Sequence, residues 1–317
     1  MFKAQDGYVL IGADYSQQEP YMTSYLSKDM TMQQAFKDGK DIYSTIASLA
    51  YNKPYDECKE FRPDGTVNKV GKERRTNSKS IVLGVLYGRS VPSIGEQLGC
   101  STKEAQEIYD RVMNAFPALQ KFIDDSQGMA RKLGYVDTAW GRRRHLKDMQ
   151  LQPYIFTYSE KTVSFDPLAF GNDVSNEVPK KIVEEYTKKL DKCKFYKDRQ
   201  KVEQELEYKG IKVKYNTNLI SQAERQCVNA RVQGTSADCT KLAMIDINND
   251  ERMREMDCHI VIQVHDEIII ECPIEHAKEG AERLSYLMRT APTRLIDLPF
   301  KCDTETTYNW YGESIEV

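Results

Sequence analysis

Two apolar segments constrain the fold of this chain most, because both predict buried β-strands that end beside acidic residues. Residues 8–13 (YVLIGA) form a short apolar run that stops at Asp14. Residues 259–272 (HIVIQVHDEIIIEC) contain two strongly β-prone runs around a polar triplet, which predicts a hairpin with Asp266 and Glu267 at its tip. Strand ends that are distant in sequence can meet in space, so Asp14 and Asp266 are candidates for one site.

Converging carboxylates favour a divalent metal ion. Magnesium prefers hard oxygen ligands such as two or three carboxylates, and it keeps several water molecules. Two such ions, about 3.5–4 Å apart, can activate an attacking hydroxyl and stabilise a leaving group. Each acid alone is weaker evidence, because an aspartate at a strand end more often caps a helix or forms a turn.

The rest of the chain has mainly helical patterns, so the sequence predicts an α+β fold with a small antiparallel sheet and many helices. Ser101 and Glu104 form a capping box, which marks the start of one helix. Gly134 closes the helix after it, and residues 53–68 are a loop punctuated by proline and glycine. The expected helices are residues 17–26, 41–51, 72–87, 101 to about 116, 116–132, 223–229, 236–248 and 276–289, followed by an irregular tail.

Residues 147–220 differ from their surroundings. They begin with an irregular part rich in proline, tyrosine and serine, and a highly charged stretch follows from residue 179 to 209. Apolar residues in that stretch recur at helical spacing, so we expect a surface insertion with one or two amphipathic helices. Two interpretations of the insertion stay open: a docking surface for a partner, or plainly a solvated helical segment.

Composition excludes some classes of protein. The 317 residues contain no run of eighteen or more apolar residues, which excludes a membrane span. The N-terminus lacks the layout of a signal peptide, so we expect a cytoplasmic protein. Eight scattered cysteines without metal-binding spacing favour buried, reduced thiols. The net charge of −3 does not predict a nucleic-acid-binding protein, but cations gather locally in residues 69–79 and 142–145.

The helix expected at residues 72–87 has a distinctive face. Arg75, Lys79, Leu83 and Tyr87 recur every four residues, so they lie along one side of it. Two cations followed by an apolar residue and an aromatic ring match the polarity of a nucleoside triphosphate, whose phosphates arginine and lysine bind. Plainer interpretations also stand, since a charge run is commonly a solvated face and Tyr87 alone is more commonly a core residue.

Five ordered segments resemble the DNA polymerases of family A, the family of bacterial DNA polymerase I. Residues 14–19 (DYSQQE) resemble its first motif, residues 75–88 (RTNSKSIVLGVLYG) its second and residues 263–267 (QVHDE) its third. Residues 147–220 have no counterpart among the resembling segments. The other resembling segments are residues 134–143 (GYVDTAWGRR) and 224–238 (ERQCVNARVQGTSAD), and the ending Asn309-Trp310 is similar as well.

The resemblance implies a right-hand polymerase fold, with a small antiparallel palm sheet and a mostly helical fingers subdomain, but without the thumb and the exonuclease. It implies a palm in residues 1–40 and 221–317, fingers in 41–133, a return to the palm in 134–146, and the partly helical surface insertion in 147–220. Either the chain is then a fragment, or a separate chain supplies the thumb or exonuclease. Because a thumb makes many phosphate contacts, this chain alone is expected to extend primers poorly.

The implied activity is template-directed DNA synthesis, in which a dNTP is transferred to a primer 3′ end with two Mg²⁺ ions, or Mn²⁺ in their place. The implied partners are primer–template DNA and dNTPs. The implied catalytic residues are Asp14, Asp266, Glu267 and Lys79, and the implied metal ligands are Asp14, Asp266 and the carbonyl of Tyr15. The implied dNTP-binding residues are Tyr15, Ser16, Gln17, Gln18, Glu19, Arg75, Lys79, Leu83 and Tyr87. The implied DNA-binding residues are Thr76, Gly88, Arg225, Asn229, Gln233 and His265.

Some residues depart from the family pattern. Leu83 stands where the family usually has Phe or Tyr, and Gln18 replaces an aliphatic residue. Tyr43 stands where a histidine that touches phosphate is common, so we expect that contact to be weaker or absent. These departures suggest a divergent, bacteriophage-like branch of the family.

Two other functions compete with DNA synthesis. A single-subunit RNA polymerase shares the two-metal palm, but the side chain of Glu19 is expected to clash with a ribose. A non-catalytic palm-and-fingers module that docks on a replication partner is the other alternative. It has no need of two carboxylates that are costly to bury, so Asp14 and Asp266 speak against it.

Overall fold

The computed structural model describes the chain apart from residues 1, 160–176, 194, 311 and 316–317. The later part of the irregular stretch expected within residues 147–220 therefore lies outside the described residues. The chain divides into two compact units. Unit 1 is residues 1–145 with 225–317, and unit 2 is residues 146–224.

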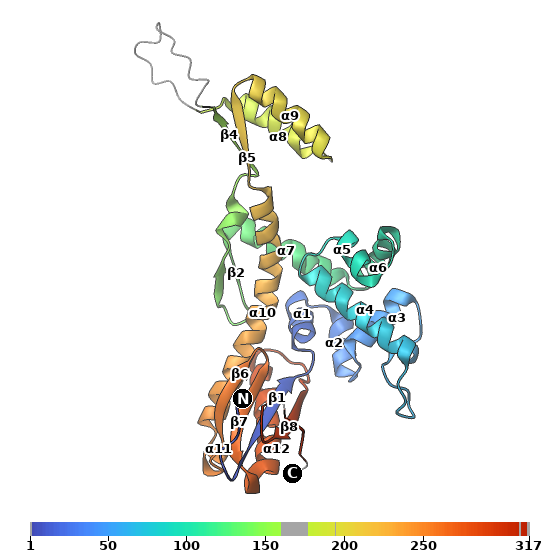
Figure 1. The fold of residues 1–317 in the computed structure, drawn as a ribbon, viewed down its shortest axis with the longest axis vertical. Helices are drawn as coiled ribbons and strands as arrows, with labels where there is room; N and C mark the ends of the chain where they lie inside the picture. The colour runs from blue at the N-terminus through green and yellow to red at the C-terminus, as the bar shows by residue number, and fades with distance from the viewer. Residues whose placement is uncertain (1, 160–176, 194, 311, 316–317) are drawn as a thin grey trace, which may run out of the picture. The chain divides into compact units, whose positions relative to one another are not determined.

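A four-stranded antiparallel sheet is the main β-structure of unit 1 (Figure 1). Its strands lie in the order β6, β7, β1, β8, so the first strand of the chain is inserted between two strands from near its end. The predicted first strand and the predicted hairpin are confirmed. The strand bounds are Tyr8–Tyr15 for β1, His259–Val264 for β6, Glu267–Pro273 for β7 and Cys302–Thr307 for β8.

One face of this sheet packs against a helix through buried apolar side chains. Val9, Ile11 and Ala13 of β1 are buried, because alternate side chains of a strand point to the same face. Helix α12 (Ala277–Thr290) packs against β1 and β8. Asp14 follows the last of these buried positions and is exposed. The alternation that builds the core therefore also leaves the acid accessible.

Capping residues set the ends of several helices in unit 1. The carboxylate of Asp41 accepts a hydrogen bond from the Ser44 N–H (2.7 Å) at the start of α3. The capping box of Ser101 and Glu104 is confirmed at α6, and Gly134 closes α7 with φ of 73°. The bounds are α1 Gln18–Ser27, α2 Met30–Lys37, α3 Ile42–Tyr51, α4 Lys69–Leu86, α5 Val91–Leu98, α6 Thr102–Ala115, α7 Pro117–Leu133 and α11 Glu251–Glu255.

Shorter elements complete unit 1. Two short strands after α7, β2 and β3, pair with each other in antiparallel fashion. Three 3₁₀ turns join longer elements. The bounds are β2 Tyr135–Asp137, β3 Arg143–His145, η1 Tyr55–Cys58, η4 Ile274–His276 and η5 Ala291–Arg294.

The helices expected at residues 223–229 and 236–248 are one continuous helix, α10 (Thr217–Asn249), so the prediction of two was wrong. Gly234 lies between the two expected helices. In the structure it allows close approach, because a Cβ there would lie 2.7 Å from Cγ2 of Thr138. The glycine thus accommodates the segment between β2 and β3 and does not end a helix.

Strand β8 was expected to be part of an irregular tail, and this expectation was also wrong. Its sequence, CDTETT, contains no apolar run, and only Thr306 and Thr307 are buried. The strand forms because β1 offers it a free edge, with Asp303 opposite Asp14 in the register. Hydrophobic patterning therefore does not reveal it.

Unit 2 has a hydrophobic core of its own. Strands β4 (Tyr154–Tyr158) and β5 (Ile211–Tyr215) pair antiparallel, and α8 (Lys180–Asp191) and α9 (Tyr196–Tyr208) lie beside them (Figure 1). The predicted amphipathic helices are confirmed, whereas β4 forms where irregular structure was expected. A 3₁₀ turn, η2, spans Lys147–Gln150. The buried cluster comprises Tyr154, Phe156, Val178, Tyr186, Leu190, Val202, Leu206 and Ile211.

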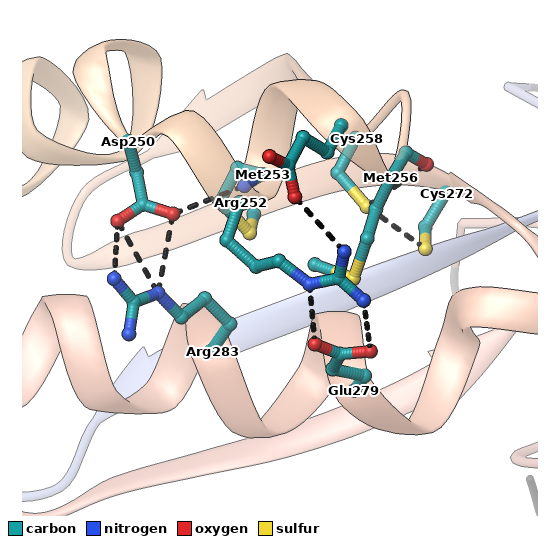
Figure 2. Close-up of polar contacts among 9 residues, drawn as sticks. Asp250, Arg252, Met253, Met256, Cys258, Cys272, Glu279 and Arg283 are labelled. Atoms are coloured by element: carbon teal, nitrogen blue, oxygen red, sulfur yellow. Dashed lines mark hydrogen bonds and ion pairs between the residues drawn. The ribbon is translucent and has the colours of Figure 1, made fainter.

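No helix in the described part of the chain is long and apolar enough to cross a membrane. All eight cysteines are free, and five of them are buried. Cys258 and Cys272, near the open end of the β6–β7 hairpin, have their sulfur atoms 3.0 Å apart (Figure 2).

Two arginine–carboxylate pairs join α12 to α11 and its capping residue (Figure 2). Asp250 caps α11 by accepting a hydrogen bond from the Met253 N–H, and the same carboxylate accepts hydrogen bonds of 2.5–3.2 Å from Arg283. Arg252 binds Glu279 with two hydrogen bonds. The Asp250 side chain is only 9% exposed, and the hydrogen bond from Arg283 holds its pKa below the usual range.

Asp250→Asn is expected to lower the free energy of unfolding by about 1–3 kcal/mol near neutral pH, because asparagine still caps α11 but carries no charge for Arg283. A carboxyl whose pKa is lowered in the folded state stabilises the fold above its unfolded pKa of about 3.9. That contribution is lost as pH falls through the folded pKa. Urea unfolding at about pH 7 and about pH 3 is the measurement, and the difference from wild type should shrink in acid.

Asp38→Asn is the matched control, since it breaks an exposed ion pair with Lys40. We expect it to change stability little at either pH. An equal loss in both variants would contradict a special contribution from the Asp250–Arg283 pair.

Candidate active site

Strand pairing brings the predicted acidic residues together at one end of the sheet. The β1–β7 register places Asp14 opposite Glu267, and the β1–β8 register places Asp303 opposite Asp14. The carboxyl of Asp266, at the hairpin tip, is within hydrogen-bonding reach of that of Asp14. Two acids about 250 residues apart in sequence thus share one small region.

The proximity of these acids has an electrostatic cost. Partial desolvation, together with the nearby charges of Asp266 and Glu267, raises the pKa of Asp14 to about 6. Burial and the charges of Asp266 and Glu305 also raise the pKa of Glu267. Like charges at close range disfavour ionisation, and a bound cation reverses this effect.

The residues present fit a hydrated Mg²⁺ better than a fully chelated metal. Among residues 2–159, 177–193, 195–310 and 312–315, no three His, Cys, Asp or Glu side chains form a group that could hold a metal ion. Magnesium commonly needs only one or two carboxylates, with waters and substrate phosphates as its other ligands. The pair Asp14 and Asp266, with the adjacent carbonyl of Tyr15, meets that requirement.

The two residues after Asp14 differ in where they point. The Tyr15 side chain is buried, and its hydroxyl donates a 2.6 Å hydrogen bond to the Met288 carbonyl. The Ser16 hydroxyl donates a 2.6 Å hydrogen bond to the carboxylate of Asp303. Only the backbone of Tyr15 is therefore available to a ligand, whereas Ser16 lies with the acidic residues.

Gln17 and Gln18 connect the first motif to other helices. Gln17 has φ of 62° and precedes α1, and its side-chain oxygen accepts a hydrogen bond from the Ile42 N–H (3.4 Å). Gln18 is buried, and its amide donates hydrogen bonds of 3.3 Å to Ser236 and Thr240 of α10. The structure thus places Gln18 in the packing between α1 and α10. Its side chain forms hydrogen bonds at a position where the family pattern has an aliphatic residue.

Glu19, Tyr87 and Gln233 form one hydrogen-bonded cluster. The Tyr87 hydroxyl lies 2.9 and 2.7 Å from the two carboxylate oxygens of Glu19. The Gln233 amide donates to Glu19 (3.1 Å) and to the Tyr87 hydroxyl (3.3 Å). Three segments that the sequence matched separately to the family therefore meet in space.

The cations of α4 differ in their partners. Arg75 binds both carboxylate oxygens of Asp41 at 3.0 Å, whereas Thr76 and Lys79 are exposed. In the described part of the chain, no hydrogen bond or ion pair joins Arg75 or Lys79 to Asp14 or Asp266. Leu83 is partly buried. Along the helix it lies between the cations and Tyr87. Other positions of α4 anchor the helix through the buried residues Ser78, Ile81, Val82, Val85 and Leu86.

The predicted DNA-binding residues are spread over three elements. Gly88 follows α4 with φ of 65°, and a Cβ there would lie 2.5 Å from Cγ of Arg225. Asn229, one helical turn beyond Arg225, has a buried side-chain oxygen without a hydrogen-bond partner among the described residues. His265 is exposed at the hairpin tip with φ of 54°.

Two residues of this region were not among the predicted site residues. Asp41 accepts hydrogen bonds from Arg75. In the sequence, an aspartate directly before the helix at 42–51 indicates only the start of that helix. Asp303 lies opposite Asp14, but the tail that contains it was expected to be irregular. The segment CDTETT has no apolar pattern from which the strand could be predicted.

The chain matches the model of the family described as DNA polymerase family A over residues 1–164 and 167–312. It therefore belongs to DNA polymerase family A, and the resemblance drawn from the motifs is confirmed. The matched ranges include most of residues 147–220, for which the motifs offered no counterpart.

Curated relatives and a solved structure agree with this family. The DNA polymerase I of Borreliella burgdorferi is 27% identical over 309 residues, which is 98% of this chain and 26% of the relative. The thermostable DNA polymerase I of Thermus aquaticus is 28% identical over 287 residues, or 90% and 25%. The chain thus spans about a quarter of the length of these relatives.

A solved structure supports the fold. The POL domain of Pol1 from M. smegmatis, in complex with DNA primer-template and dNTP, matches with a TM-score of 0.68 and 25% sequence identity. The match covers 97% of this chain and 41% of that chain. The predicted α+β polymerase fold is confirmed by this similarity.

Gly88→Ala is expected to destabilise unit 1 more than Gly99→Ala. The two glycines have φ of 65° and 66°, so alanine at either costs about 1–2 kcal/mol of backbone strain. Only at Gly88 would the new methyl overlap a neighbour, Arg225, since nothing lies within 4 Å of a Cβ at Gly99. Urea unfolding measures the difference between the two variants. Equal effects of both substitutions on stability would contradict the assigned contact.

Proposed function

We propose that this chain is the catalytic region of a template-directed DNA polymerase, which joins a dNTP to the 3′ end of a primer. The observation that carries the proposal is the convergence of Asp14 and Asp266 at one end of the sheet. Relatives named DNA polymerase I, and a similar domain in complex with DNA and dNTP, support it.

In this proposal Asp14, Asp266 and the Tyr15 carbonyl would hold two Mg²⁺ ions, or Mn²⁺ in their place. When bound, the ions supply activation of the primer hydroxyl and neutralisation of the triphosphate charge. Glu267 is an auxiliary acid, opposite Asp14 in the register. Its raised pKa indicates the same local excess of negative charge that a cation relieves.

Arg75 and Lys79 bind the triphosphate of the incoming nucleotide. The arginine fork can bind two phosphate oxygens, and the lysine ammonium acts as a compact point charge. Lys79 also assists the departure of pyrophosphate. Thr76 and Leu83 lie on the same helix, so both are near the path of the nucleotide and the template.

The Glu19 cluster selects the sugar. Hydrogen bonds from Tyr87 and Gln233 hold the Glu19 carboxylate in one position. A fixed side chain under the deoxyribose leaves no room for a 2′-hydroxyl. Tyr87 and Gly88 border the templating base.

Arg225, Asn229, Gln233 and His265 contact the primer–template. Asn229 and Gln233 are four residues apart on α10, so their amides project from one side of the helix. Amide donors suit the minor groove, where every base pair presents acceptors. The proposed contacts therefore test the shape of base pairs and do not read sequence.

Asp14→Asn and Asp266→Asn are each expected to lower primer extension with Mg²⁺ by at least about 100-fold, because each removes a charge that faces the metal and the transition state. Extension by wild type should stop when a chelator removes the metal and return when Mg²⁺ is added. Asp38→Asn, an exposed acid on a different element, is the control and should retain activity. Activity that survives both active-site substitutions would show that the carboxylate assignment is wrong.

Glu19→Ala is expected to reduce discrimination against ribonucleotides by about 10- to 100-fold, since the pocket then accepts the extra hydroxyl. Glu19→Gln keeps the bulk of the side chain and should retain most of the discrimination. The measurement is the ratio of kcat/KM for dNTP and rNTP. No gain in ribonucleotide use by Glu19→Ala would rule out the role assigned to this residue.

A further inference from the structure

Two cations of α4, Arg75 and Lys79, lie over one aromatic ring. The guanidinium carbon of Arg75 is 5.6 Å from the ring centroid of Tyr43, and the amine nitrogen of Lys79 is 5.7 Å from it. Both distances are within the range of about 6 Å in which a ring face attracts a cation. Tyr43 is only 4% exposed, so the surrounding packing fixes the position of its ring.

Asp41 holds the guanidinium of Arg75 by one edge. Nε and Nη2 each donate a 3.0 Å hydrogen bond to the carboxylate. Nη1 has no hydrogen bond among the described residues, and its nearest carboxylate, that of Glu60, is 3.8 Å away. Arginine has five N–H donors, so the outer edge can bind phosphate while Asp41 keeps the inner edge in place.

Lys79 is held more loosely than Arg75. Its side chain is exposed and forms no hydrogen bond or ion pair with any residue that the structure describes. The Tyr43 ring is thus the one contact that orients its ammonium group within that part of the chain. A flexible lysine needs such a contact, because its four-carbon stem otherwise samples many conformations.

Asp41 and Tyr43 act from one short segment. The Asp41 carboxylate accepts a 2.7 Å hydrogen bond from the Ser44 N–H and so starts α3, which carries Tyr43 in its first turn. The Tyr43 hydroxyl also lies in the field of Glu19 and Tyr87. The first turn of α3 is therefore close to both cations and to the Glu19 cluster.

We propose that Asp41 and Tyr43 are positioning residues that orient Arg75 and Lys79 for the triphosphate of the incoming nucleotide. This inference rests on the proposed function. In this position the family commonly has a histidine that touches phosphate. In this proposal the Tyr43 ring does not contact phosphate itself. It orients Arg75 and Lys79, and these two cations bind the phosphates.

The test compares Tyr43→Leu with Tyr43→Phe in primer extension. Tyr43→Leu removes the ring face from two cations and is expected to raise the KM for dNTP about tenfold, with a smaller fall in kcat. Tyr43→Phe keeps the ring and is expected to rescue most of that loss. Tyr286→Leu makes the same exchange at a ring that contacts Arg283 on α12, and it should leave the KM unchanged.

Asp41→Asn tests the second positioning residue without removing the helix cap, because asparagine caps helices as well as aspartate does. It is expected to raise the KM for dNTP about three- to tenfold, through loss of a charged two-point contact to Arg75. Thermal unfolding of each variant checks that the fold is retained.

A double-mutant cycle separates orientation of the cations from general packing. In the Lys79→Ala background, Tyr43→Leu should raise the KM clearly less than in wild type, because one of its two targets is gone. The same cycle is measured by calorimetric binding of inorganic tripolyphosphate, which needs no polymerisation. Fully additive effects, or no rescue by phenylalanine, would overturn the inference.

Failure of this inference can be distinguished from failure of the proposed function. If wild type extends primers but Tyr43→Leu leaves the KM and the tripolyphosphate affinity unchanged, only the positioning role is wrong. If wild type neither extends primers nor binds tripolyphosphate, the proposed function is wrong and the positioning role with it.

Discussion

The register between β1 and β7 is the constraint on which the candidate site depends. It places Asp14 opposite Glu267 and, through the hairpin turn, next to Asp266. A slip by one residue would turn the buried side chains of β1 toward the other face of the sheet, because strand side chains alternate. The hydrophobic core that packs on α12 therefore fixes the register, and the register fixes the acids. Core packing and chemistry are not separable in this strand.

Local backbone strain accompanies both acids. Gln17, three residues after Asp14, and His265, directly before Asp266, adopt left-handed conformations although neither is glycine. Such conformations cost on the order of 1–3 kcal/mol each and persist only where the surrounding structure imposes them. The paired strands β6 and β7 on either side of His265 impose its conformation, and the change from β1 to α1 imposes that of Gln17. The turn at Gln17 also directs the chain into α1, so that Glu19 meets Tyr87 and Gln233.

The sequence predicted those features that rest on local signals. The first strand, the hairpin, the cationic helix and the capping box at Ser101 each follow from a pattern within a few residues. Features that depend on a distant partner were missed: β8 forms on the edge of β1, and Gly234 lies inside α10 where Thr138 approaches closely, so it does not end a helix. In the candidate site, too, local patterns were predicted and contacts between distant residues were missed. The motifs located the acids and cations, but Asp41 showed only a helix-cap signal, since its contact with Arg75 exists only in the folded chain.

Charge is distributed so that each part of the candidate site has an excess of one sign, which the proposed metal–nucleotide complex would balance. The acids around Asp14 repel one another, which raises the pKa of Asp14 and leaves the group short of positive charge. On α4, Lys79 is unpaired among the described residues, and Arg75 is hydrogen-bonded along only one edge, by Asp41, with the Glu60 carboxylate 3.8 Å from its outer edge. A triphosphate that carries divalent cations satisfies both deficits at once, whereas either ion or phosphate alone satisfies one. The net charge of −3 therefore says little about the ligand, because the two signs are held on different elements.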